Sequence, residues 1–177
     1  TKYKSDDFVP YLFKTEDYGK TWVKITNGIA ANHFTRCLRA DKKVKGLLYA
    51  GTEYGMYISY DDGTSWKSFQ LNLPMVPITD LTIKENDLIV ATQGRSFWVL
   101  DDLTVVQQKA ANIINKNLHV FPVNDAYRYD GYQNLNAKNA GMNPLNGSVI
   151  NYYVKNITDS SKASIEASAQ LEERLKK

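Results

Sequence analysis

Two octets of the same pattern recur along the chain and constrain its fold more than any other feature. Residues 15–22 read Thr-Glu-Asp-Tyr-Gly-Lys-Thr-Trp, and residues 59–66 read Ser-Tyr-Asp-Asp-Gly-Thr-Ser-Trp, 44 positions further on. Both have the form Ser/Thr-x-Asp-x-Gly-x-Thr/Ser-Trp. A second match, ungapped at an offset of 40, aligns residues 48–62 with residues 88–102. Repeats of about this length that consist of short strands are typical of β-propeller blades.

Each position of the octet has a physical role in a tight turn. The Asp carboxylate can accept hydrogen bonds from backbone N–H groups of its own turn, and Gly supplies the positive φ of a sharp reversal. Trp covers the turn with a large apolar ring. A catalytic acid is needed once per site, whereas these carboxylates recur with the repeat, so we interpret them as structural. The residues assigned this structural role are Thr15, Asp17, Gly19, Thr21, Trp22, Ser59, Asp61, Gly63, Ser65 and Trp66.

The alternation of apolar and polar residues predicts an all-β fold with about two and a half blades. The first blade contributes Tyr11–Glu16 and Thr21–Thr26; the second His33–Asp41, Leu47–Thr52, Met56–Tyr60 and Ser65–Gln70; the third Ile78–Lys84, Leu88–Gln93 and Ser96–Leu100. The ungapped alignment makes Tyr57 equivalent to Phe97. Asp101-Asp102 is followed by no Gly-x-Thr-Trp, so we interpret it as a degenerate octet. These blades are too few to close a ring, so we expect them to belong to a larger propeller.

Composition divides the chain into four segments. We assign the propeller blades to residues 1–122, a linker rich in Asn, Tyr and Gly to 123–147, the first strands of a new β-sandwich to 148–166, and a helix-prone tail to 167–177. Within the third segment, the strand Gly147–Lys155 is expected to pair with Lys162–Glu166. The tyrosines of the linker are expected to pack against the propeller, with sugar binding as the alternative: Tyr127, Tyr129 and Tyr132.

The overall composition argues against several classes of function. The net charge of +3 comes from scattered lysines, so no basic stripe indicates nucleic-acid binding. No apolar run approaches the roughly 18 residues of a membrane span. The single cysteine, Cys37, excludes an intrachain disulfide framework. His33 and His119 are isolated and have no metal-ligand spacing, so we expect no metal and no cofactor.

Longer stretches around the octets resemble a known family. These are Pro10–Trp22, Leu47–Glu53, Leu71–Pro74 and Gly94–Thr104. They resemble the C-terminal part of Asp-box, or BNR-repeat, β-propellers, such as sortilin-like proteins and large bacterial proteins described as BNR-repeat glycosyl hydrolases. Residues 121–128 and 149–155 resemble the junction to an immunoglobulin-like module in those proteins. The resemblance implies a secreted, periplasmic or cell-surface location. It carries no chemistry, since Asp-boxes mark a fold.

In such a blade the box joins the third and fourth strands, so the box turns share one end of the sheets. The opposite end is the usual ligand site of a propeller. There we expect the turns Glu53-Tyr54 and Gln93–Arg95. The innermost strand brings Arg36 and Arg39 toward the channel. The ligand-binding candidates are therefore Glu53, Tyr54, Arg95 and Arg36, with the alternative that Glu53 and Arg95 are solvated or paired with each other.

Two functions remain open at this point. The first is a noncatalytic scaffold that binds a peptide, a protein or a glycan, which we favour. The alternative is a share of a sialidase-like or other BNR-repeat glycosidase whose remaining catalytic residues lie on other blades. A glycosidase needs two carboxylates that face one bond. At the expected functional end this sequence offers Glu53 and little else that is acidic.

Overall fold

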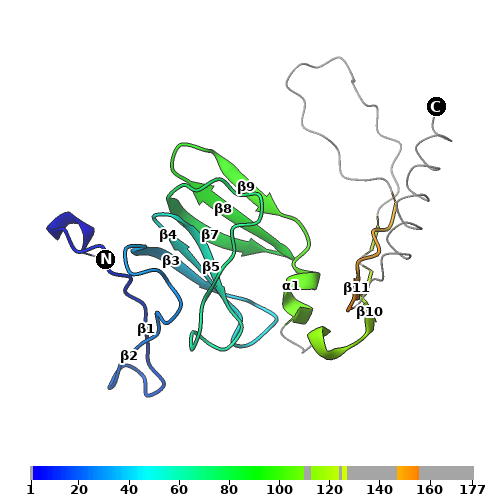
Figure 1. The fold of residues 1–177 in the computed structure, drawn as a ribbon, viewed down its shortest axis with the longest axis horizontal. Helices are drawn as coiled ribbons and strands as arrows, with labels where there is room; N and C mark the ends of the chain where they lie inside the picture. The colour runs from blue at the N-terminus through cyan, green and yellow to red at the C-terminus, as the bar shows by residue number, and fades with distance from the viewer. Residues whose placement is uncertain (1, 110–112, 124, 127–146, 156–177) are drawn as a thin grey trace, which may run out of the picture. The chain divides into compact units, whose positions relative to one another are not determined.

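A computed structural model of the 177-residue chain describes residues 2–109, 113–123, 125–126 and 147–155. The chain divides into two compact units, Thr1–Ala111 and Asn112–Lys177, which are described separately here (Figure 1). The predicted tail at 167–177, the linker tyrosines and the strand Lys162–Glu166 lie outside the described residues.

The described part of the first unit consists mostly of antiparallel strands. A short hairpin pairs β1 (Phe13–Lys14) with β2 (Val23–Lys24). A four-stranded sheet follows in the order β3 (Thr35–Ala40), β4 (Leu48–Thr52), β5 (Gly55–Ser59) and β6 (Lys67–Ser68). A three-stranded sheet then contains β7 (Ile78–Lys84), β8 (Asp87–Thr92) and β9 (Phe97–Leu100). Helical segments are short: η1 (Tyr3–Ser5) and α1 (Thr104–Lys109).

All nine strands predicted for this unit are present, and the prediction of an all-β fold is confirmed at that level. Several are shorter than expected. The predicted strand Ser65–Gln70 is reduced to the two residues of β6, and the strands on either side of the first octet are also two residues long. The octets take up one end of each of these segments, residues 15–16, 21–22 and 65–66, and the other end of each also lies outside the strands. After β9 the chain continues into α1, so the third sheet has no fourth strand among the described residues.

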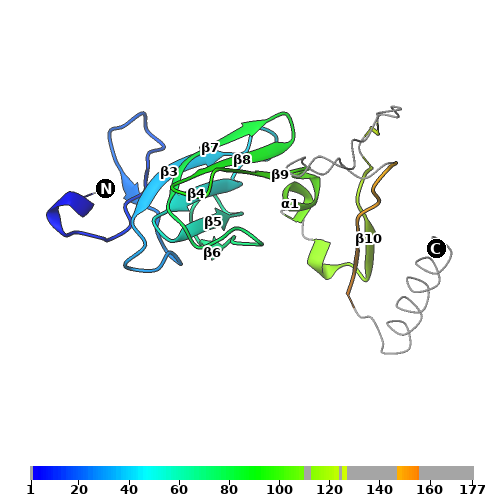
Figure 2. The ribbon, with the colours of Figure 1, turned by 90° about the horizontal axis from the view of Figure 1, so that it is seen from above.

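The two larger sheets stack face to face, as Figures 1 and 2 show, and enclose the main core. From the four-stranded sheet this core takes Tyr49, Met56 and Ile58. From the three-stranded sheet it takes residues that alternate along β7 and β8, namely Ile78, Leu81, Ile83, Leu88 and Val90. A second core lies on the other face of the four-stranded sheet and contains Leu12, Ile29, Leu48, Ala50, Tyr57 and Trp66. Both faces of β4 and β5 are therefore covered.

The structure corrects the ungapped alignment of the two repeats by one residue. Tyr57 lies opposite Ala50, whereas the residue opposite Val90 is Trp98 and not Phe97. The reason is the turn that precedes each strand. Thr52 donates its hydroxyl to the Gly55 carbonyl, three residues on, but Thr92 donates to the carbonyl of Ser96, four residues on. The extra residue turns Trp98 toward the core and Phe97 away from it.

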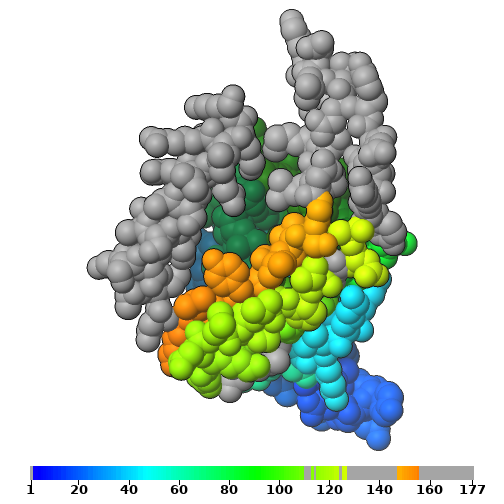
Figure 3. Space-filling view, turned by 90° about the vertical axis from the view of Figure 1, so that its right-hand side faces the viewer, coloured from blue at the N-terminus to red at the C-terminus, as the bar shows by residue number. Residues whose placement is uncertain are grey.

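In the second unit, the predicted strand Gly147–Lys155 is shortened to β11 (Tyr152–Val154). It pairs in antiparallel fashion with β10 (Leu118–Val120), and Figure 3 shows the two segments side by side in orange and yellow-green. Residues 118–120 were predicted to belong to the propeller segment, and their strand was not foreseen. The 3₁₀ turn η2 (Ile113–Asn115) precedes β10, and Ile113 and Phe121 are buried.

Candidate functional site

The two octets, here called box one (Thr15–Trp22) and box two (Ser59–Trp66), fold into the same hydrogen-bonded turn. In box two the Asp61 carboxylate accepts the N–H and the hydroxyl of Ser65 at 2.8 and 2.5 Å, and the Ser59 hydroxyl at 2.8 Å. In box one Asp17 accepts the corresponding bonds from Thr21, at 2.8 and 2.6 Å, and from Thr15. The hydrogen bonds that these two carboxylates accept all come from residues of their own turn.

These hydrogen bonds also hold both carboxylates in the ionised form. The hydroxyl and N–H of Thr21 lower the pKa of Asp17 to about 2. Burial raises the pKa of Asp61, but the bonds from Ser65 and Ser59 outweigh burial and the net pKa is lowered. A general acid in catalysis needs a pKa raised toward the working pH. The shifts run the other way, in keeping with a structural role.

The two box tryptophans differ in burial, because Trp66 packs on the preceding repeat and Trp22 does not. Trp66 is 3% exposed, and its indole N–H donates to the Ile25 carbonyl at 2.7 Å. Its backbone N–H donates to Asn27 at 2.8 Å, so the segment after β2 is fastened to box two. Trp22 is 60% exposed, and its indole N–H donates to Gly19 within its own turn.

The end of the sheets opposite box two contains four connections. These are residues 29–34, which lead from box two up to β3, the turn 53–54, residues 69–77 and the turn 93–96. Backbone bonds tie them to one another at the strand ends: Glu53 donates to Phe34 at 3.1 Å, and Gln93 donates to Pro77 at 2.9 Å. This is the end at which the sequence placed the ligand-binding candidates.

Two of those candidates form an ion pair with each other. The Arg36 Nε and Nη2 atoms both lie 2.6 Å from Glu53 Oε2, and each side chain is about a quarter exposed. The Arg36 guanidinium also lies over the rings of Phe34 and Tyr3, which stack with their centroids 4.9 Å apart. The partner of Glu53 is therefore Arg36, and the alternative that Glu53 pairs with Arg95 is wrong.

Tyr54 presents an aromatic ring at this end. Its side chain is 44% exposed, and its ring packs on His33 with the centroids 4.8 Å apart. His33 Nδ1 is in turn hydrogen-bonded to the Tyr57 hydroxyl at 2.9 Å, and burial lowers the pKa of His33. The His33 imidazole, which is held by its hydrogen bond to Tyr57, thus supports the exposed ring of Tyr54. We call Tyr54, His33 and Tyr57 the aromatic platform.

Sequence reasoning treated His33 as an isolated residue and missed this platform. The signal was the strand register. Thr35 pairs with Thr52, and the ladder continues through the bond from Glu53 to Phe34, so the next residues outward are His33 and Tyr54. A firm register for β3 and β4 would have brought the two rings together.

Arg95 and Arg39 have different surroundings. Arg95 is exposed in the turn between β8 and β9, and its carbonyl accepts the indole N–H of Trp98 at 2.9 Å. No ion pair of its guanidinium occurs within the described part of the chain. Arg39 Nη2 lies 2.6 Å from Asp80 Oδ1 and so links β3 to β7.

Two kinds of site are not found in the described residues. Within residues 2–109, 113–123, 125–126 and 147–155, no three His, Cys, Asp or Glu side chains lie together as metal ligands would. In the same ranges no helix has the length and apolarity to cross a bilayer.

Burial raises the pKa of the Cys37 thiol to about 11, which argues against a reactive thiolate.

Comparisons with known proteins leave the family resemblance untested. No family model matches the chain, and no curated protein is detectably similar to it.

Proposed function

We propose that this chain is part of an exported Asp-box β-propeller that acts as a noncatalytic scaffold and binds a peptide, protein or glycan. Two observations support the propeller. The two boxes share one hydrogen-bond pattern, and two antiparallel meanders of similar length stack on each other in sequence order. Under this proposal the boxes are structural, and the ligand meets the end of the sheets opposite box two.

The observation that carries the binding role is the aromatic platform. An exposed tyrosine ring that is already held in place loses little conformational freedom when a ligand packs on it. Tyr54 is held by His33, which is itself hydrogen-bonded to Tyr57. Tyrosine and arginine, together with tryptophan, are enriched at energetically important contact points. Arg95 adds an exposed cation in a turn at the same end.

The acidic groups at this end favour binding over glycoside hydrolysis. Glu53 is the single acidic residue in the four connections that the structure describes there. Both Arg36 Nε and Nη2 lie 2.6 Å from its Oε2 atom, so this carboxylate is engaged within the protein. A glycosidase needs a second carboxylate facing the same bond. The described residues at this end of the sheets therefore favour the binding scaffold over the glycosidase alternative.

The experiment is a screen of the chain against glycan and peptide arrays, repeated with Tyr54→Ala. Tyr18→Ala is the matched control, because Tyr18 is a fully exposed tyrosine within box one. We expect Tyr54→Ala to weaken the selected ligand at least tenfold, about 1.4 kcal/mol, while Tyr18→Ala leaves it unchanged. Equal binding by both variants would place the site elsewhere, and turnover of a bound glycan would revive the glycosidase.

A further inference from the structure

The three-stranded sheet ends in an open strand edge. β9 pairs with β8 on one side, and no described strand pairs with its other side. Because Thr92 donates its N–H to Ser96, alternation directs the backbone groups of Phe97 and Val99 toward the open edge. The edge carries none of the usual protection by lysine, proline or a bulge. In addition, Phe97 and Val99 are 75% and 53% exposed.

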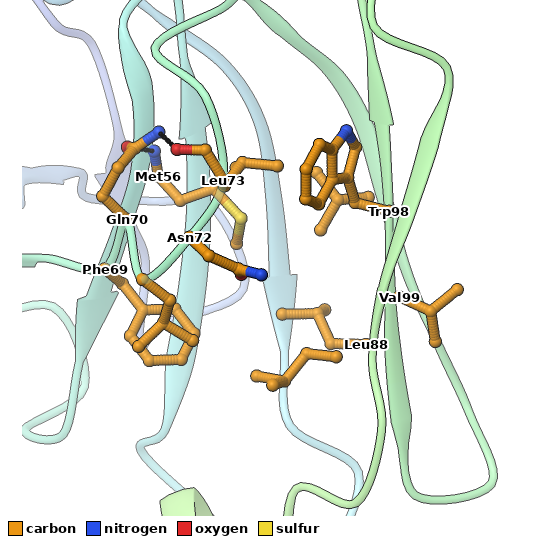
Figure 4. Close-up of a pocket in the computed structure, with 11 residues that line it drawn as sticks. Met56, Phe69, Gln70, Asn72, Leu73, Leu88, Trp98 and Val99 are labelled. Carbon is orange, nitrogen blue, oxygen red and sulfur yellow. Dashed lines mark hydrogen bonds between the residues drawn. The ribbon is translucent and has the colours of Figure 1, made fainter. Parts of the chain in front are cut away.

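An apolar hollow lies beside this edge, between the two stacked sheets (Figure 4). Trp98 points into the hollow from β9, and Val99 points away from it. Leu88 forms its floor, and Phe69 and Leu73 form the opposite wall. The hollow exists because the four-stranded sheet faces a sheet that has one strand fewer.

The four-stranded sheet shows what fills the equivalent place. There β6 pairs with β5, and the Phe69 N–H donates to the Met56 carbonyl at 2.8 Å. Immediately before β6, Trp66 is fixed by bonds to the Ile25 and Asn27 carbonyls. At the 44-residue spacing of the boxes, these carbonyls correspond to Phe69 and Leu71. Both residues line the hollow.

We propose that the open edge of β9 is a strand-addition site that takes an extended, tryptophan-containing peptide segment. The segment runs antiparallel to β9, its backbone pairs with Phe97 and Val99, and its tryptophan enters the hollow against Phe69. Main-chain bonds would supply affinity and the seated side chain specificity, as in other cases of β-augmentation.

Charges at the two ends of β9 set the direction of the segment. Asp101 follows the strand and Arg95 precedes it, and both side chains are exposed. An antiparallel segment begins near Asp101 and ends near Arg95. Its amino end therefore meets a carboxylate and its carboxyl end meets a guanidinium, whereas a parallel segment would meet like charges.

The test uses the full 177-residue chain and a free peptide with the sequence of residues 64–70, Thr-Ser-Trp-Lys-Ser-Phe-Gln. We expect saturable one-to-one binding in a fluorescence or NMR titration, with the amide signals of Phe97 and Val99 shifting. Replacing the peptide tryptophan by alanine should weaken binding at least tenfold. So should N-methylation at the peptide phenylalanine, since its N–H corresponds to the donor of Phe69.

A variant of the chain tests the same edge. Val99→Pro removes an N–H that faces the open side and leaves the pairing with β8, so it should weaken binding at least tenfold, while Val99→Thr should not. If Val99→Pro does not fold, the N-methylated peptide still decides. No saturable binding, or equal binding of a scrambled peptide, would overturn the proposal. So would sedimentation showing that a second copy of the chain occupies β9 and is not displaced by the peptide.

Discussion

At the residue scale, the two boxes form the same turn, but their tryptophans differ in burial. The turn itself is local, because each donor lies within four residues of the Asp61 acceptor. The tryptophan is different, since its burial depends on the repeat beside it. Asp61 is exposed although its hydrogen bonds are made, so the stability of box two depends more on Trp66 than on the carboxylate.

We predict that Trp66→Ala lowers the free energy of unfolding by about 3–5 kcal/mol, the usual cost of truncating a buried large aromatic residue. Trp22→Ala, the matched change in box one, should cost less than about 1 kcal/mol because its ring already faces solvent. Denaturant titration of both variants measures the difference. Equal losses would mean that Trp22 has a packing partner that the described residues do not show.

At the element scale, neighbouring strands of the four-stranded sheet are fastened at the end opposite box two by a pair of side chains. Arg36 lies on β3, and Glu53 follows β4 directly. Their ion pair is partly shielded and is backed by the rings of Tyr3 and Phe34. The pair joins β3 to the turn that carries Tyr54, and we expect it to hold that turn beside the aromatic platform.

A double-mutant cycle on Arg36→Ala and Glu53→Ala should give a coupling free energy of about 1 kcal/mol. The control is Arg39→Ala with Asp80→Ala, an ion pair that is about half exposed, for which less than about 0.5 kcal/mol is expected. A coupling near zero for the first pair would show that Glu53 is free to contact a ligand instead.

Strand order was predictable from the sequence because the octets mark the turns and the alternation marks the strands. Strand lengths were not, because the box turns hold residues 65 and 66, which the alternation had assigned to a strand. The ungapped alignment placed Phe97, and not Trp98, at the position of Tyr57. The turn before β9 has one extra residue, and the sequence pattern does not show an insertion this small. The strand Leu118–Val120 was missed because three residues give little periodicity.

The candidate site was also predicted only in part, because the sequence does not show which side chains meet across neighbouring strands. The four candidates lie at the expected end of the sheets, but their partners depend on side-chain reach across strands. Arg36 could have pointed to a ligand, to Glu53 or to solvent, and only the ladder between β3 and β4 decides among them. The same ladder places His33 against Tyr54 in the candidate site.

At the scale of the whole molecule, the proposed function gives the two ends of the stacked sheets different roles. The end with box two would maintain the fold through its tight turn, and the opposite end would present Tyr54, supported by His33, to a ligand. Separation of this kind is common where loops on a stable scaffold carry function. It also means that stability and ligand affinity should respond to different residues.

The most direct test is the affinity of the array-selected ligand for Tyr54→Ala and Asp61→Ala, titrated well below the melting temperature of each. We predict at least a tenfold loss for Tyr54→Ala with its melting temperature retained. Asp61→Ala should keep wild-type affinity while losing about 1 kcal/mol of stability, because it removes only turn hydrogen bonds. Wild-type affinity in Tyr54→Ala together with abolished binding in folded Asp61→Ala would contradict the account.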